Sequence, residues 1–398
     1  MSVGVKPSVL MVSYQYAPVA DGGAERQAQV LAEKLAARGW PIGVVTARYP
    51  GTARFECVAG VDVHRVWAIP RPRRFSATFL PSLARFLLLQ GRRYAIWHAH
   101  QAFYNAGISL SLARLLGRRC VVKDACSGIY GDLARLSRVK FGGWVKRQLR
   151  RADAVISLNS EMTDELLGAG VANSRIRPIP NGVDCDRFSP ATRELRLRAR
   201  GALGIPPTSL VALFAGRLAE DKGISYLIDA WRHVETKGPA HQWCLIIAGE
   251  ELRQGEYRPR GERELRTVRF VGKVPDIRPL LQAADVLIHP SLSEGLSNVV
   301  LEAMATGLPV VGTRTAGLKE QVVDGVTGVL VSPRDAEALA EAVGALLGNG
   351  ERRVRLGAAG RDRAVQRFDL SSVVDAYEKL YHELMPLPVD SAAVSYPC

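Results

Sequence analysis

Short aliphatic runs alternate with helix-length amphipathic segments along almost the whole chain. In the first half the runs predict strands at residues 9–13, 42–46, 61–66, 95–100, 120–123, 155–158 and 177–179. The alternation restarts in the second half, at residues 211–215, 245–248, 268–271, 286–289, 310–312 and 328–331. Parallel sheets covered by helices produce this pattern. It predicts an α/β fold with two Rossmann-like, doubly wound domains.

A length of 398 residues also suits two domains rather than one. Prolines and an Arg-rich segment between Pro190 and Pro207 predict the linker. Near the end of the chain, apolar residues at helical spacing predict a helix that crosses back to the first domain. The chain beyond that helix lacks periodicity, which predicts a flexible tail. The four expected parts are 1–190, 191–369, 370–385 and 386–398.

The charge distribution is uneven, because the whole net charge of +14 falls within residues 1–190. No acidic residue lies between Asp62 and Asp124, whereas that window holds eleven lysines and arginines. Such a surface favours an anionic partner. A nucleic acid is not expected, since the cations lack the aromatic stacking platforms of a nucleic-acid-binding module.

The six cysteines form no C-x-x-C pair and have no histidine at metal-ligand spacing. This pattern predicts a reducing compartment and no zinc site. No stretch approaches the 18 or so apolar residues that span a bilayer. We therefore expect a cytoplasmic protein, with peripheral attachment to the inner face of the membrane as an open alternative.

Two carboxylates bracket the start of a predicted helix in the second half. The loop after the predicted strand 286–289 contains Glu294, and Glu302 follows in the helix that begins near Ser297, a good N-cap residue. The amino end of such a helix favours a diphosphate, because its free backbone N–H groups and its dipole attract anions. Carboxylates on either side can accept hydrogen bonds from the hydroxyls of a nucleotide sugar.

Two cations follow the first predicted strand of the second half. Arg217 and Lys222 stand five residues apart in the stretch Gly216-Arg217-Leu218-Ala219-Glu220-Asp221-Lys222-Gly223. A guanidinium and an ammonium at a strand-to-helix turn can neutralise a leaving pyrophosphate without a metal ion. A surface ion pair with Glu220 or Asp221 is the alternative interpretation.

These motifs resemble those of the family 4 retaining glycosyltransferases, and the resemblance extends from Val9 to about Leu384. Glu294 and Glu302 match the E-x7-E signature, and the Arg217–Lys222 stretch matches a G-R-L-x-x-x-K-G diphosphate-binding turn. Two further segments also resemble the family: the G-G-A-E-R turn at residues 22–26 and the P-N-G-V-D segment at residues 180–184.

The resemblance implies a glycosyltransferase B fold, in which an acceptor-binding and a nucleotide-sugar-binding domain face a cleft. It implies retaining transfer with no cofactor and no metal, and a UDP-sugar is the expected donor. Arg217, Lys222 and Glu294 are the expected catalytic residues, with Glu294 on the hexose and Glu302 on the ribose. The expected donor-binding residues are Gly22, Gly23, Gly216, Arg217, Lys222, Gly272, Lys273, Val274, Glu294, Gly295, Leu296, Ser297, Asn298 and Glu302.

One departure concerns the acceptor side, where many relatives carry a histidine after the fifth strand. This chain reads Val-Val-Lys-Asp-Ala-Cys-Ser-Gly at residues 121–128. His98 and His100 precede that segment as alternatives, although a core or cleft-wall histidine is the competing interpretation. A milder departure is Gly249-Glu250, where Gly-Asp is common. The acceptor-side candidates are His100, Lys123, Asp124 and Ser127.

The acceptor is expected to be lipid-linked, in glycan or cell-surface polysaccharide synthesis. Residues 140–151 predict a basic amphipathic helix containing a tryptophan, which with residues 75–89 suits docking on an anionic membrane. A helix packed on its own domain, with a solvated basic side, fits the pattern equally well. A soluble or natural-product acceptor, and a sugar-nucleotide epimerase of the same fold, also stay open. The D-x-D at residues 184–186 is the minor, metal-binding alternative.

Overall fold

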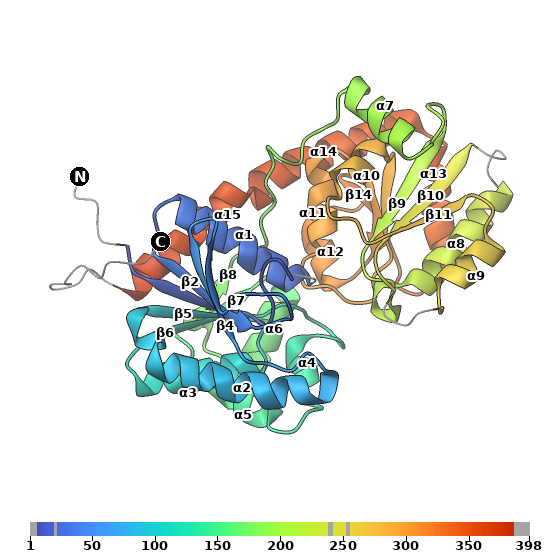
Figure 1. Ribbon diagram of the computed structural model, residues 1–398. Coiled ribbons are helices and arrows are strands. Elements are labelled where there is room, and N and C mark those ends of the chain that lie inside the picture. Colours follow the sequence, from blue (N-terminus) through green and yellow to red (C-terminus); the bar gives the residue numbers. More distant parts are fainter. Residues whose placement is uncertain (1–5, 20–21, 238–241, 252–254, 386–398) are drawn as a thin grey trace. The chain divides into compact units, whose positions relative to one another are not determined.

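The computed structural model describes residues 6–19, 22–237, 242–251 and 255–385 (Figure 1). The chain divides into two compact units, residues 1–181 with 373–398 and residues 182–372. Each unit contains one twisted sheet with helices on its faces (Figure 1). The predicted α/β class with two Rossmann-like units is therefore confirmed. The expected tail at 386–398 lies outside the described residues.

The first unit is built on an eight-stranded sheet with the order β3-β4-β2-β1-β5-β6-β7-β8. Its neighbouring strands are parallel except for the antiparallel pair of β3 with β4. The strands are β1 Val9–Val12, β2 Ile42–Ala47, β3 Phe55–Val58, β4 Val61–Val66, β5 Ile96–His100, β6 Arg119–Lys123, β7 Ala154–Ser157 and β8 Ile176–Pro178. The helices are α1 Gly23–Ala37, α2 Pro72–Leu89, α3 Tyr104–Leu115, α4 Asp132–Leu136, α5 Gly142–Leu149 and α6 Ser160–Gly168.

Strand β3 was not predicted, because only part of it is apolar and its side chains are exposed or half-buried in alternation. It returns along β4 through a tight turn at Ala59 and Gly60, both with positive φ. In contrast, every residue of β1 is buried, as expected for a central strand covered on both faces. Strands buried in this way are the ones that a continuous aliphatic run predicts well.

The second unit has a six-stranded parallel sheet with the order β11-β10-β9-β12-β13-β14. Its strands are β9 Leu210–Ala215, β10 Trp243–Ala248, β11 Val268–Gly272, β12 Val286–His289, β13 Val310–Thr313 and β14 Gly328–Val331. Its helices are α7 Arg193–Ala202, α8 Ile224–Lys237, α9 Arg258–Glu264, α10 Arg278–Ala283, α11 Asn298–Ala305, α12 Ala316–Gln321, α13 Ala336–Leu347 and α14 Gly350–Phe368. The chain order of the strands reverses between β9 and β12, which makes that point the switch point where such sheets bind ligands.

Helix α8 illustrates why the second unit folds as it does. Leu227, Ile228, Trp231 and Val234 recur at helical spacing and are all buried against the sheet. The Trp231 indole also donates a hydrogen bond to Thr267 Oγ1 over 3.0 Å, so its one polar atom is satisfied within the core.

The expected boundary at residue 190 lies nine residues beyond the boundary found between Asn181 and Gly182. Backbone hydrogen bonds join Val183 to Phe368 and Leu370, and the Arg361 guanidinium donates to the carbonyls of Cys185 and Phe188. These bonds place the segment after residue 181 in the second unit. The P-N-G-V-D segment therefore straddles the boundary instead of preceding it.

The last helix, α15 Leu370–Leu384, belongs to the first unit from Val373 onward. Tyr381 Oη lies 2.7 Å from Nδ1 of His98 on β5, and the Trp40 indole donates to Glu378 over 2.7 Å. None of the helices described is both long and apolar enough to cross a membrane.

Candidate active site

The site in the second unit begins at the carboxyl end of β9. Gly216 and Arg217 follow that strand, and a short 3-10 turn at Glu220–Lys222 leads into α8. Gly223 ends the turn with φ +68°, and a Cβ there would collide with the carbonyl of Pro290. Glycine is therefore required at this position both for its backbone conformation and for the close approach of the loop after β12.

The loops after β9 and β12 are joined by hydrogen bonds to one carbonyl group. The Asp221 carbonyl accepts from the Leu292 backbone N–H over 2.8 Å and from the Ser291 hydroxyl over 3.0 Å. Strands β9 and β12 are neighbours in the sheet although more than seventy residues separate them in sequence. The topology thus brings the Arg217–Lys222 stretch and the Glu294 loop to the same place.

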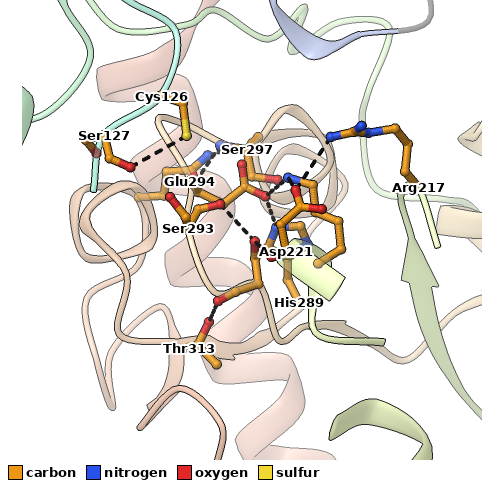
Figure 2. A network of polar contacts seen from close by, with 12 residues as sticks. Cys126, Ser127, Arg217, Asp221, His289, Ser293, Glu294, Ser297 and Thr313 are labelled. Carbon is orange, nitrogen blue, oxygen red and sulfur yellow. Dashed lines mark hydrogen bonds and ion pairs between the residues drawn. The ribbon is translucent and has the colours of Figure 1, made fainter. Parts of the chain in front are cut away.

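Lys222 lies between two carboxylates. Its Nζ atom is 2.6 Å from Oε1 of Glu294 and 3.9 Å from Oδ2 of Asp221, and 18% of its side chain is exposed. Arg217, half-exposed, contacts the same Asp221 oxygen over 3.5 Å. The ion pair of Arg217 with Asp221 that was the alternative interpretation of the stretch is present (Figure 2). A direct link from Lys222 to Glu294 is present as well.

Glu294 also contacts a histidine that the sequence analysis did not single out. His289 Nε2 lies 2.9 Å from Oε1 of Glu294, and the His289 side chain is buried. Burial alone would raise the pKa of Glu294, but the Lys222 ammonium and the hydrogen bond from His289 outweigh it and lower that pKa well below its usual range. Glu294 is therefore a mostly buried acceptor whose ionised form is favoured. The only sequence signal was a histidine at the end of a predicted strand.

Helix α11 begins directly after Ser297, as expected, and a neighbouring helix holds its start. Ser297 occupies the N-cap position, but its side chain makes no capping hydrogen bond. Instead the buried Gln321 amide accepts from the Ser297 backbone N–H over 3.0 Å and donates to the Ser297 carbonyl over 2.7 Å. Ser297 is therefore the N-cap residue by position, as expected, but the Gln321 amide and not the serine hydroxyl fixes the backbone there.

The remaining donor-side candidates lie around this core of the site. Gly295 and Leu296 are buried in the loop before α11, while Asn298 and Glu302 are half-buried on the helix itself. Gly317 on α12 packs against that loop so closely that its backbone N–H reaches the Glu294 carbonyl over 3.2 Å. The loop is thus fixed from two sides.

Gly272 is the last residue of β11, and Lys273 and Val274 follow it, next to the turn after β10. The Gly249 N–H donates to the Gly272 carbonyl over 2.8 Å, and the Gly216 N–H donates to the Ala248 carbonyl over 3.0 Å. These bonds link the ends of β9, β10 and β11 in a row. The three strands therefore present a continuous edge of backbone beside Arg217.

In the first unit, Gly22 and Gly23 lie at the start of α1, after β1. Gly22 occupies the N-cap position, and a Cβ there would collide with the Glu25 side chain. The Glu25 carboxylate is buried and accepts a hydrogen bond from Gln101 Nε2 over 2.9 Å. Since Gln101 follows β5, the glycine turn lies at the switch point of the first sheet, between β1 and β5.

The acceptor-side candidates His100 and Lys123 are buried at the ends of β5 and β6. The rings of His98 and His100 are 4.3 Å apart, and Lys123 Nζ lies 5.8 Å from the centre of the Tyr377 ring. Burial, helped by Lys123, lowers the pKa of His98 to about 3, and burial lowers the pKa of Lys123 to about 7. His98, bonded to Tyr381, is a core histidine as the competing interpretation held.

Asp124 and Ser127, the other two acceptor-side candidates, lie in a group of polar side chains whose remaining members the sequence did not predict. Burial, and then the neighbouring Asp132 and Glu165, raise the pKa of Asp124 well above its usual value. Asp132 accepts backbone hydrogen bonds from Ala102 and Ala125, and Glu165 accepts one from Gly128. Ser127 Oγ is 3.4 Å from the amide of Asn159. Asp132 comes from α4 and Glu165 from α6. No sequence motif links these two carboxylates to Asp124.

The basic helix expected at residues 140–151 is shorter in the structure and packs on its own unit. Val145 and Leu149 of α5 are fully buried, and the Trp144 ring lies against Gly107 of α3. The apolar side of this helix is therefore occupied by α3, whereas Phe141 just before it is 67% exposed. On α2, Leu89 is 63% exposed.

Comparison with known proteins agrees with this geometry. Residues 209–349 match the family model described as glycosyl transferases group 1, and residues 21–187 match the model of glycosyltransferase family 4. A glycogen synthase of Mycobacterium tuberculosis is 31% identical over 94% of this chain and 94% of its own length. A D-inositol 3-phosphate glycosyltransferase of Corynebacterium urealyticum is 32% identical over 61% of this chain, and the match spans 59% of that relative's length.

Solved structures share the fold over nearly the whole chain. A sucrose-phosphate synthase from Thermosynechococcus elongatus is 25% identical with a TM-score of 0.80, covering 95% of this chain and 99% of its own. HepE from Anabaena, solved in complex with UDP and glucose, is 21% identical with a TM-score of 0.78, covering 95% and 100%. The chain belongs to glycosyltransferase family 4 and is a glycosyltransferase with the type B fold.

Proposed function

We propose that this enzyme transfers a sugar, with retention of anomeric configuration and without a metal ion, from a nucleoside diphosphate sugar to an acceptor hydroxyl. The observation that carries the proposal is the meeting of Arg217, Lys222 and Glu294 at the switch point of the second sheet. Two cations and an ionised carboxylate there suit a donor that carries both a diphosphate and a sugar. A UDP-sugar is favoured because the related fold of HepE was solved with UDP and glucose.

In this mechanism the two cations stabilise the charge of the departing diphosphate as the donor bond breaks. Arg217 can exchange its contact with Asp221 for a phosphate oxygen, since its side chain is half-exposed. The amino end of α11 adds backbone N–H groups, held in position by Gln321. Glu294 accepts hydrogen bonds from the sugar hydroxyls, and Glu302 serves the ribose. No nucleophilic side chain is needed, because stabilisation of the leaving group supplies the catalysis.

The acceptor we favour is lipid-linked, in glycan or cell-surface polysaccharide synthesis at the inner face of the membrane. The cationic first unit and the exposed Phe141 and Leu89 support it, because both features suit an anionic membrane surface. A soluble acceptor is the second candidate. It is favoured by the packing of α5 on α3 and by the relatives named for D-inositol 3-phosphate, a soluble anion.

Calorimetric titration with UDP, GDP and ADP, each with EDTA or Mg²⁺, tests the donor. We expect UDP to bind in EDTA and Lys222→Met to weaken that binding at least tenfold, with Lys237→Met on the exposed end of α8 as the control. Incubation with UDP-glucose and product analysis then separates transfer from epimerisation of the donor. Absence of binding by every nucleotide, or a strict Mg²⁺ requirement, would contradict the proposed metal-independent donor site.

A further inference from the structure

A cavity of about 840 Å³ lies in the first unit, at the amino edge of its sheet. Residues at or just before the starts of four neighbouring strands line it: Ala95 for β5, Arg119 for β6, Asp153 for β7 and Arg175 for β8. The acceptor-side candidates lie at or just after the carboxyl ends of two of these strands, β5 and β6. This cavity is therefore a separate feature of the first unit, at the opposite edge of the sheet from those candidates.

The lining is strongly basic, and we call it the arginine cavity. Six of its fourteen residues are arginines, and only one is acidic. They come from the ends of α3 and α5 and from the strand starts, so residues distant in sequence converge there. The arginines are Arg114, Arg118, Arg119, Arg150, Arg151 and Arg175.

The single carboxylate of the cavity is already engaged. Asp153 Oδ1 pairs with Arg119 over 2.8 Å, and Asp153 Oδ2 accepts the Cys120 backbone N–H over 2.8 Å. Arg150 and Arg175 donate to the carbonyls of Ala169 and Ala152, each over 2.7 Å. Carbonyl groups orient these guanidinium groups without cancelling their charge. Five positive charges are therefore left without a carboxylate inside the cavity.

Arg118 adds an observation of a different kind. Its Nε atom is buried and has no hydrogen-bond partner among the residues that the structure describes. Buried N–H donors are almost always satisfied in folded proteins, by protein groups or by ordered water, so this donor can take a ligand oxygen as its partner. A guanidinium group also presents its donors as a planar fork that matches phosphate oxygens.

We propose that the arginine cavity binds a small anion with at least two phosphate groups. One phosphate would neutralise only part of the five uncompensated charges, whereas two or more would pair with most of them. The volume falls within the range of about 300–1,000 Å³ that is usual for small-molecule sites. Leu384 and Met385 at the end of α15 form an apolar part of the wall, which suits a phosphorylated organic molecule better than an inorganic ion.

The test uses the full chain and sodium tripolyphosphate as the probe in a low-salt calorimetric titration. The variant Arg118→Gln/Arg151→Gln is expected to bind it at least tenfold more weakly. The control Arg48→Gln/Arg54→Gln removes the same charge from exposed positions outside the cavity and is expected to bind normally. Arg151→Gln alone, at an exposed side chain, covers the case in which the double variant does not fold. Equal affinity in the cavity and control variants would overturn the proposal.

Tripolyphosphate can also reach the proposed donor site, so Lys222→Met is titrated in parallel. Lys222→Met is expected to keep the tripolyphosphate binding that Arg118→Gln/Arg151→Gln loses. Loss of binding at the arginine cavity can therefore be told apart from loss of binding at the proposed donor site. Sedimentation with cardiolipin and phosphatidylcholine vesicles identifies the source. Binding to cardiolipin that excess tripolyphosphate displaces assigns the phosphates to a lipid headgroup, and tripolyphosphate binding without vesicle binding assigns them to a soluble ligand. Failure to bind either probe excludes the site.

Discussion

The Nζ atom of Lys222 lies 2.6 Å from Oε1 of Glu294, the carboxylate oxygen that also contacts the His289 ring. The pair joins the loops after β9 and β12, the neighbouring strands at which the chain order of the sheet reverses. In the absence of substrate it keeps a buried carboxylate ionised and a cation in place. The following predictions test what each member of this arrangement does.

Replacement of Lys222 by methionine is expected to reduce transfer by about 10²–10³-fold, because one donor to the developing charge is lost. It should also lower the free energy of unfolding by about 1–3 kcal/mol, since the buried Glu294 loses its countercharge. Adding Glu294→Gln is expected to restore stability without restoring transfer. Steady-state kinetics and urea unfolding measure the two effects separately. Unchanged stability in Lys222→Met would show that Glu294 does not depend on this ion pair.

Arg217→Gln is expected to behave differently from Lys222→Met. Its side chain is half-exposed and pairs with Asp221 over 3.5 Å, so the unfolding free energy should change by less than about 1 kcal/mol. Transfer should nevertheless fall by about 10²-fold, because a charged donor to the diphosphate is removed. The matched control is Arg232→Gln, an equally exposed arginine on α8. Near-normal turnover of Arg217→Gln would exclude a role in leaving-group stabilisation.

His289→Ala tests whether this histidine positions Glu294. Removing its hydrogen bond raises the pKa of Glu294, so the loss of activity on acidification should begin at a higher pH than in the parent enzyme. The pH profile of kcat/KM is the measurement, and His289→Asn should partly restore the parent profile. A role limited to packing would lower activity equally at every pH. His233→Ala, at an exposed position, is the control.

Lys123 is expected to make stability depend on pH in the alkaline range. Burial lowers its pKa from 10.5 to about 7 in the folded state, so between those values the unfolded chain binds more protons and stability rises with pH. Lys123→Met removes that rise. The melting temperature of the variant should therefore exceed that of the parent most near neutral pH, and this difference should shrink toward about pH 10. Lys237→Met should show no such trend. A parallel pH dependence in parent and Lys123→Met would contradict a buried, perturbed lysine.

Asp124→Asn should keep the fold, because burial raises the pKa of Asp124 and the carboxyl is neutral where the unfolded chain would be ionised. As pH rises above the ordinary value of 3.8, the unfolded state releases this proton more readily, so the parent loses stability that the amide retains. The melting temperature of the variant relative to the parent should increase from about pH 4 to neutrality. Asp164→Asn on α6 is the exposed control. A constant difference would show that Asp124 is ionised in the fold.

The class of fold and the family followed from local patterns in the sequence. Buried strands such as β1 and β9 are continuous aliphatic runs, so their positions were predicted to within a residue or two. The half-exposed edge strand β3 lacks such a run and was missed. The boundary near Pro190 was displaced for a similar reason, because prolines signal a break in the local chain but not which unit a segment bonds to.

The candidate site likewise has residues that the sequence predicted and residues that it did not. Arg217, Lys222 and Glu294 stand in recognisable motifs, whereas His289, Gln321 and Asp132 contribute through contacts that no spacing encodes. Gln321 shows the point well. It binds the backbone N–H and carbonyl of Ser297 from a helix that begins after the next strand, a contact that no local pattern predicts.

By itself the amino-acid sequence determined the alternation of strands and helices, the uneven charge and the motif residues, since each is a property of neighbours along the chain. Only the tertiary structure decided that Glu294 shares one oxygen between Lys222 and His289, that α5 buries its apolar side on α3, and that six arginines converge on one cavity. The physical reason is strand order. A parallel sheet places the ends of sequence-distant strands side by side, and burial there sets charges and pKa values that local sequence does not contain.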